Sequence, residues 1–185
     1  MALVLVKEDG SGLSNANSYA SAADGDGYHD GHLYASVWTA ATTGSKEAAL
    51  VMATRLIDAM FRFNGFKRVT GQALQWPRRE CRDPDSDSGI VPGLMFVWGS
   101  FLDETKVPAA ILQATCELGR ELLKTDLTAA PSGQGFAKLR VEGALELDFD
   151  PKDRPAPVTP LVQAMLGKLG DYVGQRSGMV PLVRV

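Results

Sequence analysis

An amphipathic stretch from Ser45 to Phe63 constrains the fold of this chain more than any other part of its sequence. Its apolar residues recur at intervals of three and four, as they do along one side of an α-helix. They are Ala49, Met52, Ala53, Leu56, Ile57, Met60 and Phe63. Asp58 lies off this stripe, where we expect it to pair with Arg55 and Arg62 on the water-facing side. Ser45 suits the N-terminal cap and Gly65 a left-handed stop, so the sequence predicts a scaffold helix with one buried face.

Length and composition indicate one soluble intracellular domain. The 185 residues are 45% hydrophobic, which is enough for a core. The net charge of −3 and the pI near 5.4 disfavour a general nucleic-acid binder, whose affinity depends on cations that neutralise phosphates. Cys81 and Cys116 match no metal or redox spacing, and we expect Cys116 to be a reduced thiol buried in a helix. No export signal is recognisable, and the longest charge-free run, between Asp87 and Asp103, is too short and too interrupted for a membrane span.

Three further helices are expected. The first covers residues 21–38, begins at Ser18 or Ser21, and is weakened by Gly25 and two later glycines. The next covers residues 109–124, with Thr105 as a candidate cap and Pro108 near its first position.

Within this second helix we expect Glu117, Arg120, Glu121 and Lys124 to face water, and Gly119 to permit a close helix crossing. The last helix opens at Thr159-Pro160 and closes at Gly174, with Leu161 and Leu166 on its apolar stripe.

Residues 138–150 change to a period of two, which is typical of a half-buried strand or of a hairpin that turns at Gly143. The predicted fold is therefore mainly α: a small helical bundle with a β-hairpin or extended excursion and an extended C-terminal arm. We expect one domain over residues 1–174, followed by the arm, residues 175–185.

No complete catalytic or metal-binding set is recognisable, so we expect neither an enzyme nor a cofactor. The segment from Asp24 to His32 invites a metal interpretation, but it fails the calcium-loop template at Tyr28, His29 and Ala35. His29 and His32 lack an evident third ligand, and a solvated helix face is the preferred interpretation.

A long irregular segment, residues 64–104, is the strongest candidate for contact with a partner. Pro77 forces an extended backbone on Trp76, beside Arg78 and Arg79, and tryptophan and arginine are enriched at interfaces. The alternative is that Trp76 fills the core while the arginines face water. Further interface candidates are Trp98 and Phe101 in an apolar run, and the terminal residues Leu182, Val183, Arg184 and Val185.

Several blocks of this sequence together resemble a family of tailed-phage proteins. They are residues 12–19 (GLSNANSY), the helix from Lys46 to Ala59, residues 72–78 (QALQWPR), and Val107-Pro108 with residues 114–118. The resemblance implies a head–tail connector (adaptor) protein, and the family is also described as DnaT-like and single-stranded-DNA-binding.

The connector function implies a structural virion protein, made in the bacterial cytoplasm and located at the head–tail junction. Its copies would form a dodecameric ring that docks under the portal protein, surrounds the DNA channel and meets the next neck or tail protein. The rival function is a phage single-stranded-DNA-binding module that uses Lys67, Arg68, Trp76, Arg78 and Arg79.

Overall fold

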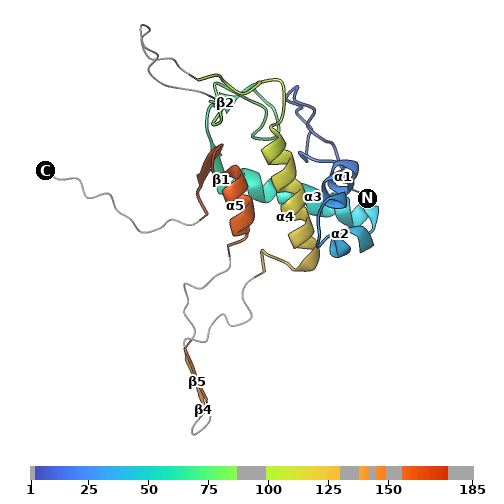
Figure 1. Cartoon of the computed structure of the whole chain (residues 1–185), viewed down its shortest axis with the longest axis vertical. Helices are drawn as coiled ribbons and strands as arrows, with labels where there is room; N and C mark the ends of the chain where they lie inside the picture. Colours follow the sequence, from blue (N-terminus) through green and yellow to red (C-terminus); the bar gives the residue numbers. More distant parts are fainter. Residues whose placement is uncertain (1–2, 87–98, 130–137, 142–144, 149–155, 175–185) are drawn as a thin grey trace, which may run out of the picture.

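The structure, a computed structural model, describes residues 3–86, 99–129, 138–141, 145–148 and 156–174. Its helices are α1 (Ala22–Asp30), α2 (Ser36–Ala40), α3 (Thr43–Met60), α4 (Ala109–Lys124) and α5 (Pro160–Leu166). Its strands are β1 (Phe61–Phe63), β2 (Phe66–Lys67), β3 (Arg78–Arg79), β4 (Lys138–Val141), β5 (Leu145–Asp148) and β6 (Gly170–Tyr172). The strands form three antiparallel pairs: β1 with β6, β2 with β3, and β4 with β5. In Figure 1, α3 and α4 cross at the centre, with α1 and α2 on one side and α5 on the other.

The central helix, α3, begins and ends earlier than the sequence predicts. Thr42 is its cap, because its Oγ1 accepts the backbone N–H of Ser45 at 3.2 Å. The helix ends at Met60 because the next three residues form β1, which pairs with β6 from a distant part of the chain. Gly65 has the expected left-handed conformation, with φ of 71°, but it lies in the turn between β1 and β2.

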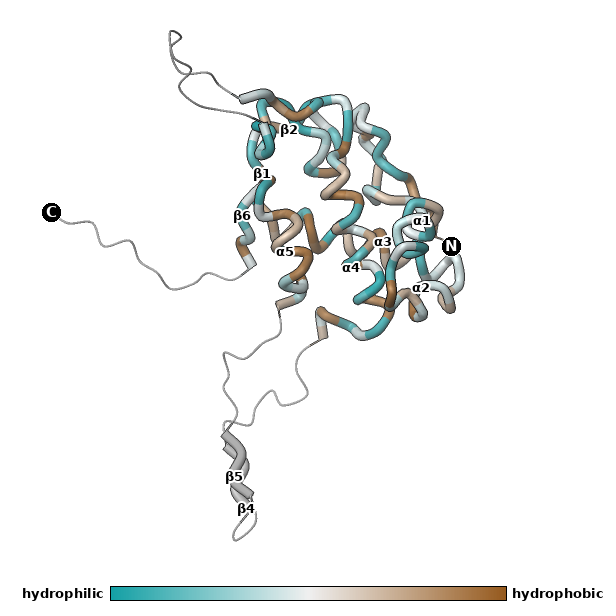
Figure 2. The backbone as a smooth tube through the Cα atoms, in the orientation of Figure 1, coloured by the Kyte–Doolittle hydropathy of each residue, from teal (hydrophilic) through white to brown (hydrophobic). Residues whose placement is uncertain are grey.

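The main core lies where α3, α4 and α5 meet. Fully buried apolar side chains come from all three helices: Ala53, Ile57, Ile111, Ala114, Leu118, Val162 and Leu166. Figure 2 shows hydrophobic segments converging in this region. Burial of each large side chain contributes on the order of 2 kcal/mol. The predicted close crossing at Gly119 is confirmed, since a Cβ there would lie 3.3 Å from Leu50 Cδ2 of α3.

Trp38 of α2 anchors a second, smaller core. It is fully buried, and its Nε1 donates to Asp26 Oδ1 at 2.8 Å. Gly25 of α1 lies directly against the indole ring, so that any side chain at this position would collide with it. The predicted helix over residues 21–38 is therefore two helices, and Gly25 is required for the packing between them. Ser21 caps α1 in a capping box with Asp24.

Two charged residues of α4 that the sequence placed in water are buried. Glu117 and Arg120 are only 1% and 5% exposed, and the Arg120 guanidinium binds the Glu117 carboxylate. Arg120 also pairs with Glu121 Oε1 at 2.6 Å and donates to the Tyr34 carbonyl at 3.3 Å. The loop between α1 and α2 brings Tyr34 to α4, so α4 is covered on a face that its own sequence predicts to be solvated.

The last helix also ends earlier than predicted. Thr159 precedes α5 and Pro160 is its first residue, as expected, but the helix stops at Leu166. Residues Gly170–Tyr172 then form β6, in which Gly170 pairs with Phe63 and Tyr172 with Phe61. A side chain at position 170 would collide with the Arg62 carbonyl of β1, so this pairing requires glycine.

The predicted fold class, a mainly α helical bundle, is wrong. In the described part of the chain only α3 and α4 are longer than nine residues, and short strand pairs join remote segments to them. Of the two alternatives for residues 138–150, a single strand or a hairpin, the structure has two strands, β4 and β5, paired antiparallel with Leu139 opposite Leu147 and Val141 opposite Leu145; the expected turn at Gly143 lies outside the described residues. The C-terminal arm, residues 175–185, lies outside the described residues.

Candidate nucleic-acid interface

Three of the sequence blocks that carry the family resemblance meet at the hydroxyl of Tyr19. This hydroxyl donates to Asp58 Oδ1 at 2.5 Å and accepts the backbone N–H groups of Gln75 and Trp76, each at 3.1 Å. Asp58 Oδ2 also accepts the N–H of Gln75, at 3.0 Å. Tyr19 is fully buried, so this cluster fixes the loop before Pro77 to the body of the protein.

Asp58 was expected to pair with arginines on the surface of α3, and the structure corrects this. Its carboxylate is half-buried beneath the loop before Pro77, and this burial raises its pKa to about 6 even though the hydrogen bonds from Tyr19 and Gln75 oppose the shift. Burial likewise raises the pKa of the Tyr19 phenol, and the neighbouring Asp58 carboxylate reinforces that shift.

The N-terminal block is ordered by Glu8, which sequence reasoning missed. Its carboxylate is buried and accepts the backbone N–H groups of Gly10, Gly12 and Leu13, each at 2.9 Å. Gly10 and Gly12 have φ of 99° and 84°, which glycine adopts readily. The GLSNANSY block therefore has a structural role, because Glu8 fixes the backbone at its start.

Trp76 lies in the core and not on a surface. Its side chain is 0% exposed and packs edge-to-face on Phe63, with ring centroids 5.7 Å apart. The peptide bond between Trp76 and Pro77 is cis. Trp76 is therefore not available as an interface residue. It fills the core, which is the alternative stated in the sequence analysis.

Arg78 is also structural. It is 8% exposed, and its guanidinium donates to backbone carbonyls on both sides of the β1–β2 turn. The acceptors are the carbonyls of Phe63, Asn64 and Gly65, at 3.2, 2.7 and 2.6 Å, with Gln75 as a further partner. All of these bonds hold the turn to the loop, so the structure leaves Arg78 unavailable to a partner.

Arg79, the next residue, is exposed and lies beside an exposed aromatic ring. In the β2–β3 pair, Arg79 is directly opposite Phe66, whose side chain is 60% exposed. Residues that face one another across an antiparallel pair extend from the same side of the sheet. The first aromatic–arginine pair on this surface is therefore Phe66 with Arg79.

A second such pair follows three residues later. Glu80 has φ of 57°, a left-handed conformation that interrupts strand alternation in the way the extra residue of a β-bulge does. Cys81 consequently points inward and is 1% exposed, whereas Arg82 is exposed. Arg82 forms an antiparallel bridge with Phe101, and Phe101 is 57% exposed.

We call Phe66, Arg79, Arg82 and Phe101 the aromatic–arginine platform. Lys67 is an exposed neighbour on β2, although its Nζ lies 3.4 Å from the Gln72 carbonyl. Arg68 is half-buried and donates to the Gly10 carbonyl at 2.7 Å. Figure 1 shows this part of the chain at one end of the body, around the label β2.

The chemistry of the platform suits an unpaired nucleic-acid strand. Exposed aromatic rings can stack with bases, and adjacent guanidiniums can bind phosphates. Carboxylates are also present near the platform, since Glu80 lies between Arg79 and Arg82 and Asp83 follows Arg82. The nearby Asp85 pairs with Lys168 at 2.5 Å.

Sequence reasoning found part of this platform. It named Arg79 and Phe101, but it missed Phe66 and gave no role to Arg82. An available signal for Phe66 was its place directly before Lys67 and Arg68. The other predicted interface residues, Trp98, Leu182, Val183, Arg184 and Val185, lie outside the described residues.

The two histidines lie near the second core. His29 is buried, its Nε2 is 3.2 Å from the Cys116 carbonyl oxygen, and burial lowers its pKa, so the predicted solvated face is wrong for this residue. His32 Nε2 lies 3.6 Å from Glu117 Oε2.

Cys116 is a buried free thiol, as predicted, and burial raises its pKa to about 12. Across the described residues, no group of three or more His, Cys, Asp or Glu side chains could hold a metal ion.

A family model described as "Putative DnaT-like ssDNA binding protein" matches residues 1–185. The chain belongs to this family. Its description corresponds to the rival function inferred from the sequence and does not name a head–tail connector. No curated protein and no solved structure matched this member of the DnaT-like family. None of the helices in the described part of the chain has the length and hydrophobicity to cross a membrane.

Proposed function

We propose that this chain binds single-stranded DNA through the aromatic–arginine platform. The observation that carries the proposal is the repeated cross-strand pairing of exposed residues, Phe66 with Arg79 and Phe101 with Arg82. Two bases would stack on the two rings, and the phosphates beside them would contact the guanidiniums. The family description supports the same ligand class.

The stacking part of the proposal is tested with Phe66→Ala. A base stacked on an aromatic side chain contributes about 1–3 kcal/mol, so we expect the Kd for an oligothymidine of about 16 nucleotides to rise at least fivefold. Fluorescence anisotropy of a labelled oligonucleotide measures this. Val173→Ala, which shortens another exposed apolar residue far along the chain, is the matched control and should leave the Kd unchanged. Equal affinity of the wild type and Phe66→Ala would contradict the proposal.

The electrostatic part is tested with Arg79→Ala over a range of salt concentrations. Loss of one phosphate contact should lower the slope of log K against log salt by about 0.7. Arg55→Ala removes an exposed arginine from α3 and should keep the wild-type slope. Duplex DNA of the same sequence should bind more weakly than the single strand, because paired bases cannot reach the rings. Tighter binding to duplex would argue against stacking.

The head–tail adaptor function is a separate proposal, which comes from the sequence resemblance. It requires a ring that docks on a portal protein, with contacts from Trp98 and residues 182–185. Purified chain that assembles on a portal ring and binds no oligonucleotide would favour it. Platform-dependent binding by the isolated chain would favour the single-strand function.

A further inference from the structure

The loop between α1 and α2 presents two exposed apolar side chains, Leu33 and Tyr34, which we call the loop tip. They are 85% and 70% exposed, yet both polar groups of the Tyr34 backbone are bound. The Tyr34 N–H donates to His32 Nδ1 at 3.0 Å, and its carbonyl accepts Arg120 Nη1 at 3.3 Å. Arg120 is only 5% exposed, so the second bond joins the loop tip to the interior beside α4.

His32 lies between the loop tip and a buried carboxylate of α4. Its Nε2 is 3.6 Å from Glu117 Oε2, and Glu117 is 1% exposed. The other oxygen of Glu117 binds the Arg120 guanidinium, whereas Oε2 has no hydrogen-bond partner among the described residues. A buried carboxylate oxygen without a hydrogen bond favours a positive charge in front of it. The His32 side chain is 24% exposed and can therefore exchange protons with water.

The hydrogen bond from Tyr34 determines which nitrogen of neutral His32 carries the proton. A neutral imidazole has one donor and one acceptor nitrogen. Because Nδ1 accepts the Tyr34 N–H, the proton is on Nε2, the nitrogen nearest Glu117. A second proton must bind to Nδ1, where it removes the acceptor and places two N–H groups against each other. Protonation of this ring is therefore incompatible with the bond that holds the Tyr34 N–H.

The other groups of α1 and of the loop that lie near His32 are uncharged. The His29 ring centroid is 5.8 Å from that of His32, and burial lowers the pKa of His29, which favours its neutral form. Tyr28 packs against His29, and burial raises the pKa of its phenol, which also favours the neutral form. The Tyr34 ring lies 6.4 Å from His32.

The charged groups of α4 balance one another except at Glu117 Oε2. Arg120 binds both Glu117 and Glu121, the latter at 2.6 Å, and Glu121 also binds Lys124 at 2.9 Å. A positive charge on His32 consequently finds its nearest opposite charge at Glu117. The same event that breaks the bond to Tyr34 strengthens the contact to α4.

We propose that His32 is a proton-operated switch that releases the Tyr34 N–H when the imidazole takes up a second proton, and so changes the position of the loop tip. In the neutral state the ring accepts this N–H. In the cationic state the ring pairs with Glu117, and Leu33 and Tyr34 move. Histidine ordinarily changes its charge between pH 5 and 8, so the switch operates near neutral pH. This inference concerns the α1–α2 loop and does not depend on DNA binding.

Nuclear magnetic resonance of the ¹⁵N-labelled full chain between pH 8 and pH 5 tests the proposal. The chain has two histidines, so few ring signals need to be assigned. At pH 8 the proton of His32 should be on Nε2. As the pH falls, the amide proton of Tyr34 should shift upfield with the same midpoint as the His32 ring, because it loses its hydrogen bond. A Tyr34 amide that does not follow the His32 ring, or a neutral ring with its proton on Nδ1, would overturn the proposal.

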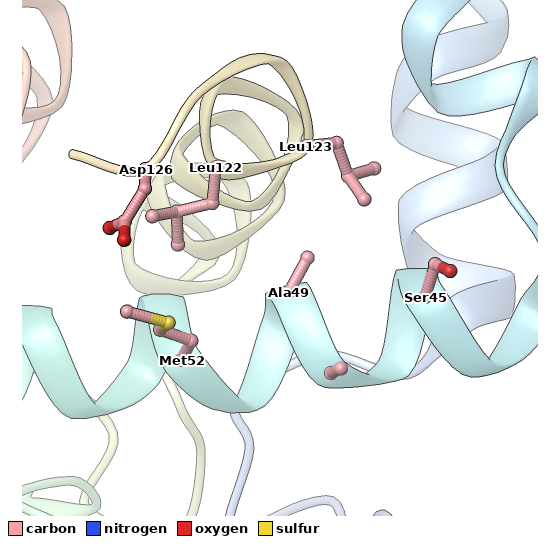
Figure 3. A pocket seen from close by; sticks show the side chains of 7 residues that line it. Ser45, Ala49, Met52, Leu122, Leu123 and Asp126 are labelled. Atoms are coloured by element: carbon pink, nitrogen blue, oxygen red, sulfur yellow. The ribbon is translucent and has the colours of Figure 1, made fainter. Parts of the chain in front are cut away.

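Thr128 supplies a control of matching geometry. Its N–H donates to Asp126 Oδ1 at 2.9 Å, again two residues earlier in the chain, and the hydrogen bonds from Thr128 lower the pKa of Asp126. Asp126 lines a pocket between α3 and the end of α4, with Met52 and Leu122, and none of the groups around His32 belongs to this lining (Figure 3). The Thr128 amide should therefore keep its position between pH 8 and pH 5.

Two substitutions imitate the two states. The side-chain oxygen of His32→Asn can accept an N–H two residues later and does not titrate, so the Tyr34 amide should keep its pH 8 position at pH 5. His32→Lys supplies a positive charge without an acceptor. At pH 7.5, chymotrypsin should cleave after Tyr34 at least about threefold faster in His32→Lys than in His32→Asn, because a released loop opens more often. Equal cleavage of the two variants, or a pH-dependent Tyr34 amide in His32→Asn, would contradict the switch.

Discussion

The inner and outer sides of the segment from Arg78 to Arg82 use the same residue type for different purposes. Arg78 faces inward, where its guanidinium donates to the carbonyls of Phe63, Asn64 and Gly65. Arg79 and Arg82 face outward beside Phe66 and Phe101. Strand alternation and one left-handed residue, Glu80, decide which arginine does which. The side of the strand on which an arginine lies therefore decides whether it stabilises the fold or belongs to the candidate binding surface.

The largest expected difference is between Arg78→Ala and Arg79→Ala. Arg78→Ala removes all the hydrogen bonds that this guanidinium makes to the turn and to Gln75, and we expect the free energy of unfolding to fall by about 4 kcal/mol. Arg79→Ala should change it by less than about 0.5 kcal/mol, because its side chain is exposed. Urea unfolding at pH 7 measures both. Similar losses for the two variants would remove the distinction between the inner and outer sides.

The buried carboxylate beneath the loop gives a prediction for pH. The pKa of Asp58 is about 6 in the folded protein and near 3.8 when unfolded. Between these values the folded state holds the extra proton, so the free energy of unfolding should fall as pH rises from about 4 to about 6. The contribution from this group is about 3 kcal/mol over the window, with little further change above it. Urea unfolding across this range should show the fall, and Asp58→Asn should abolish it. If the free energy of unfolding of the wild type instead rose from pH 4 to pH 6, and Asp58→Asn removed that rise, the pKa of Asp58 would be lowered on folding and the prediction would be wrong.

A smaller loss is expected from Tyr19→Phe. This change removes a hydroxyl that donates to Asp58 and accepts two backbone N–H groups. We expect the free energy of unfolding to fall by about 2 kcal/mol. It should also move the pH window of Asp58 upward, because the hydrogen bond from Tyr19 lowers the pKa of that carboxyl. The control is Tyr34→Phe, whose side chain is mostly exposed and which should cost less than about 0.5 kcal/mol. If the two variants unfold alike, the Tyr19 cluster does not hold the loop.

The smallest effects are expected at Glu80, between the two sides. Glu80→Asn places a residue that tolerates a left-handed backbone at φ of 57°, and stability should rise by about 0.5 kcal/mol. Glu80→Gln keeps the conformational cost and removes only the charge. Both variants should bind oligothymidine about two- to threefold more tightly, since a carboxylate between Arg79 and Arg82 repels phosphates. A gain in affinity for Glu80→Asn alone would indicate that backbone conformation, and not charge, governs binding.

Helix patterning explains why α3 and α4 could be predicted and why their polar residues could not. Apolar spacing located both helices, and Gly119 was correctly expected at a close crossing. The same spacing wrongly predicted that Glu117, Arg120 and Asp58 face water. A charged residue on the outer side of a single helix can be covered by another segment of the chain. Here the covering segments are the α1–α2 loop and the loop before Pro77.

The sequence alone determined the local features: the amphipathic helices, the opening of α5 at Pro160 and the alternating hairpin at β4 and β5. These depend on interactions between residues close together in the chain, so periodicity and capping chemistry reveal them. The tertiary structure alone decided that β1 ends α3, that Trp76 and Arg78 face inward, and that Phe66 and Arg82 lie opposite Arg79 and Phe101. Each of these outcomes depends on a partner distant in the sequence, such as β6 for β1 and Phe101 for Arg82, and local patterns contain no information about such partners.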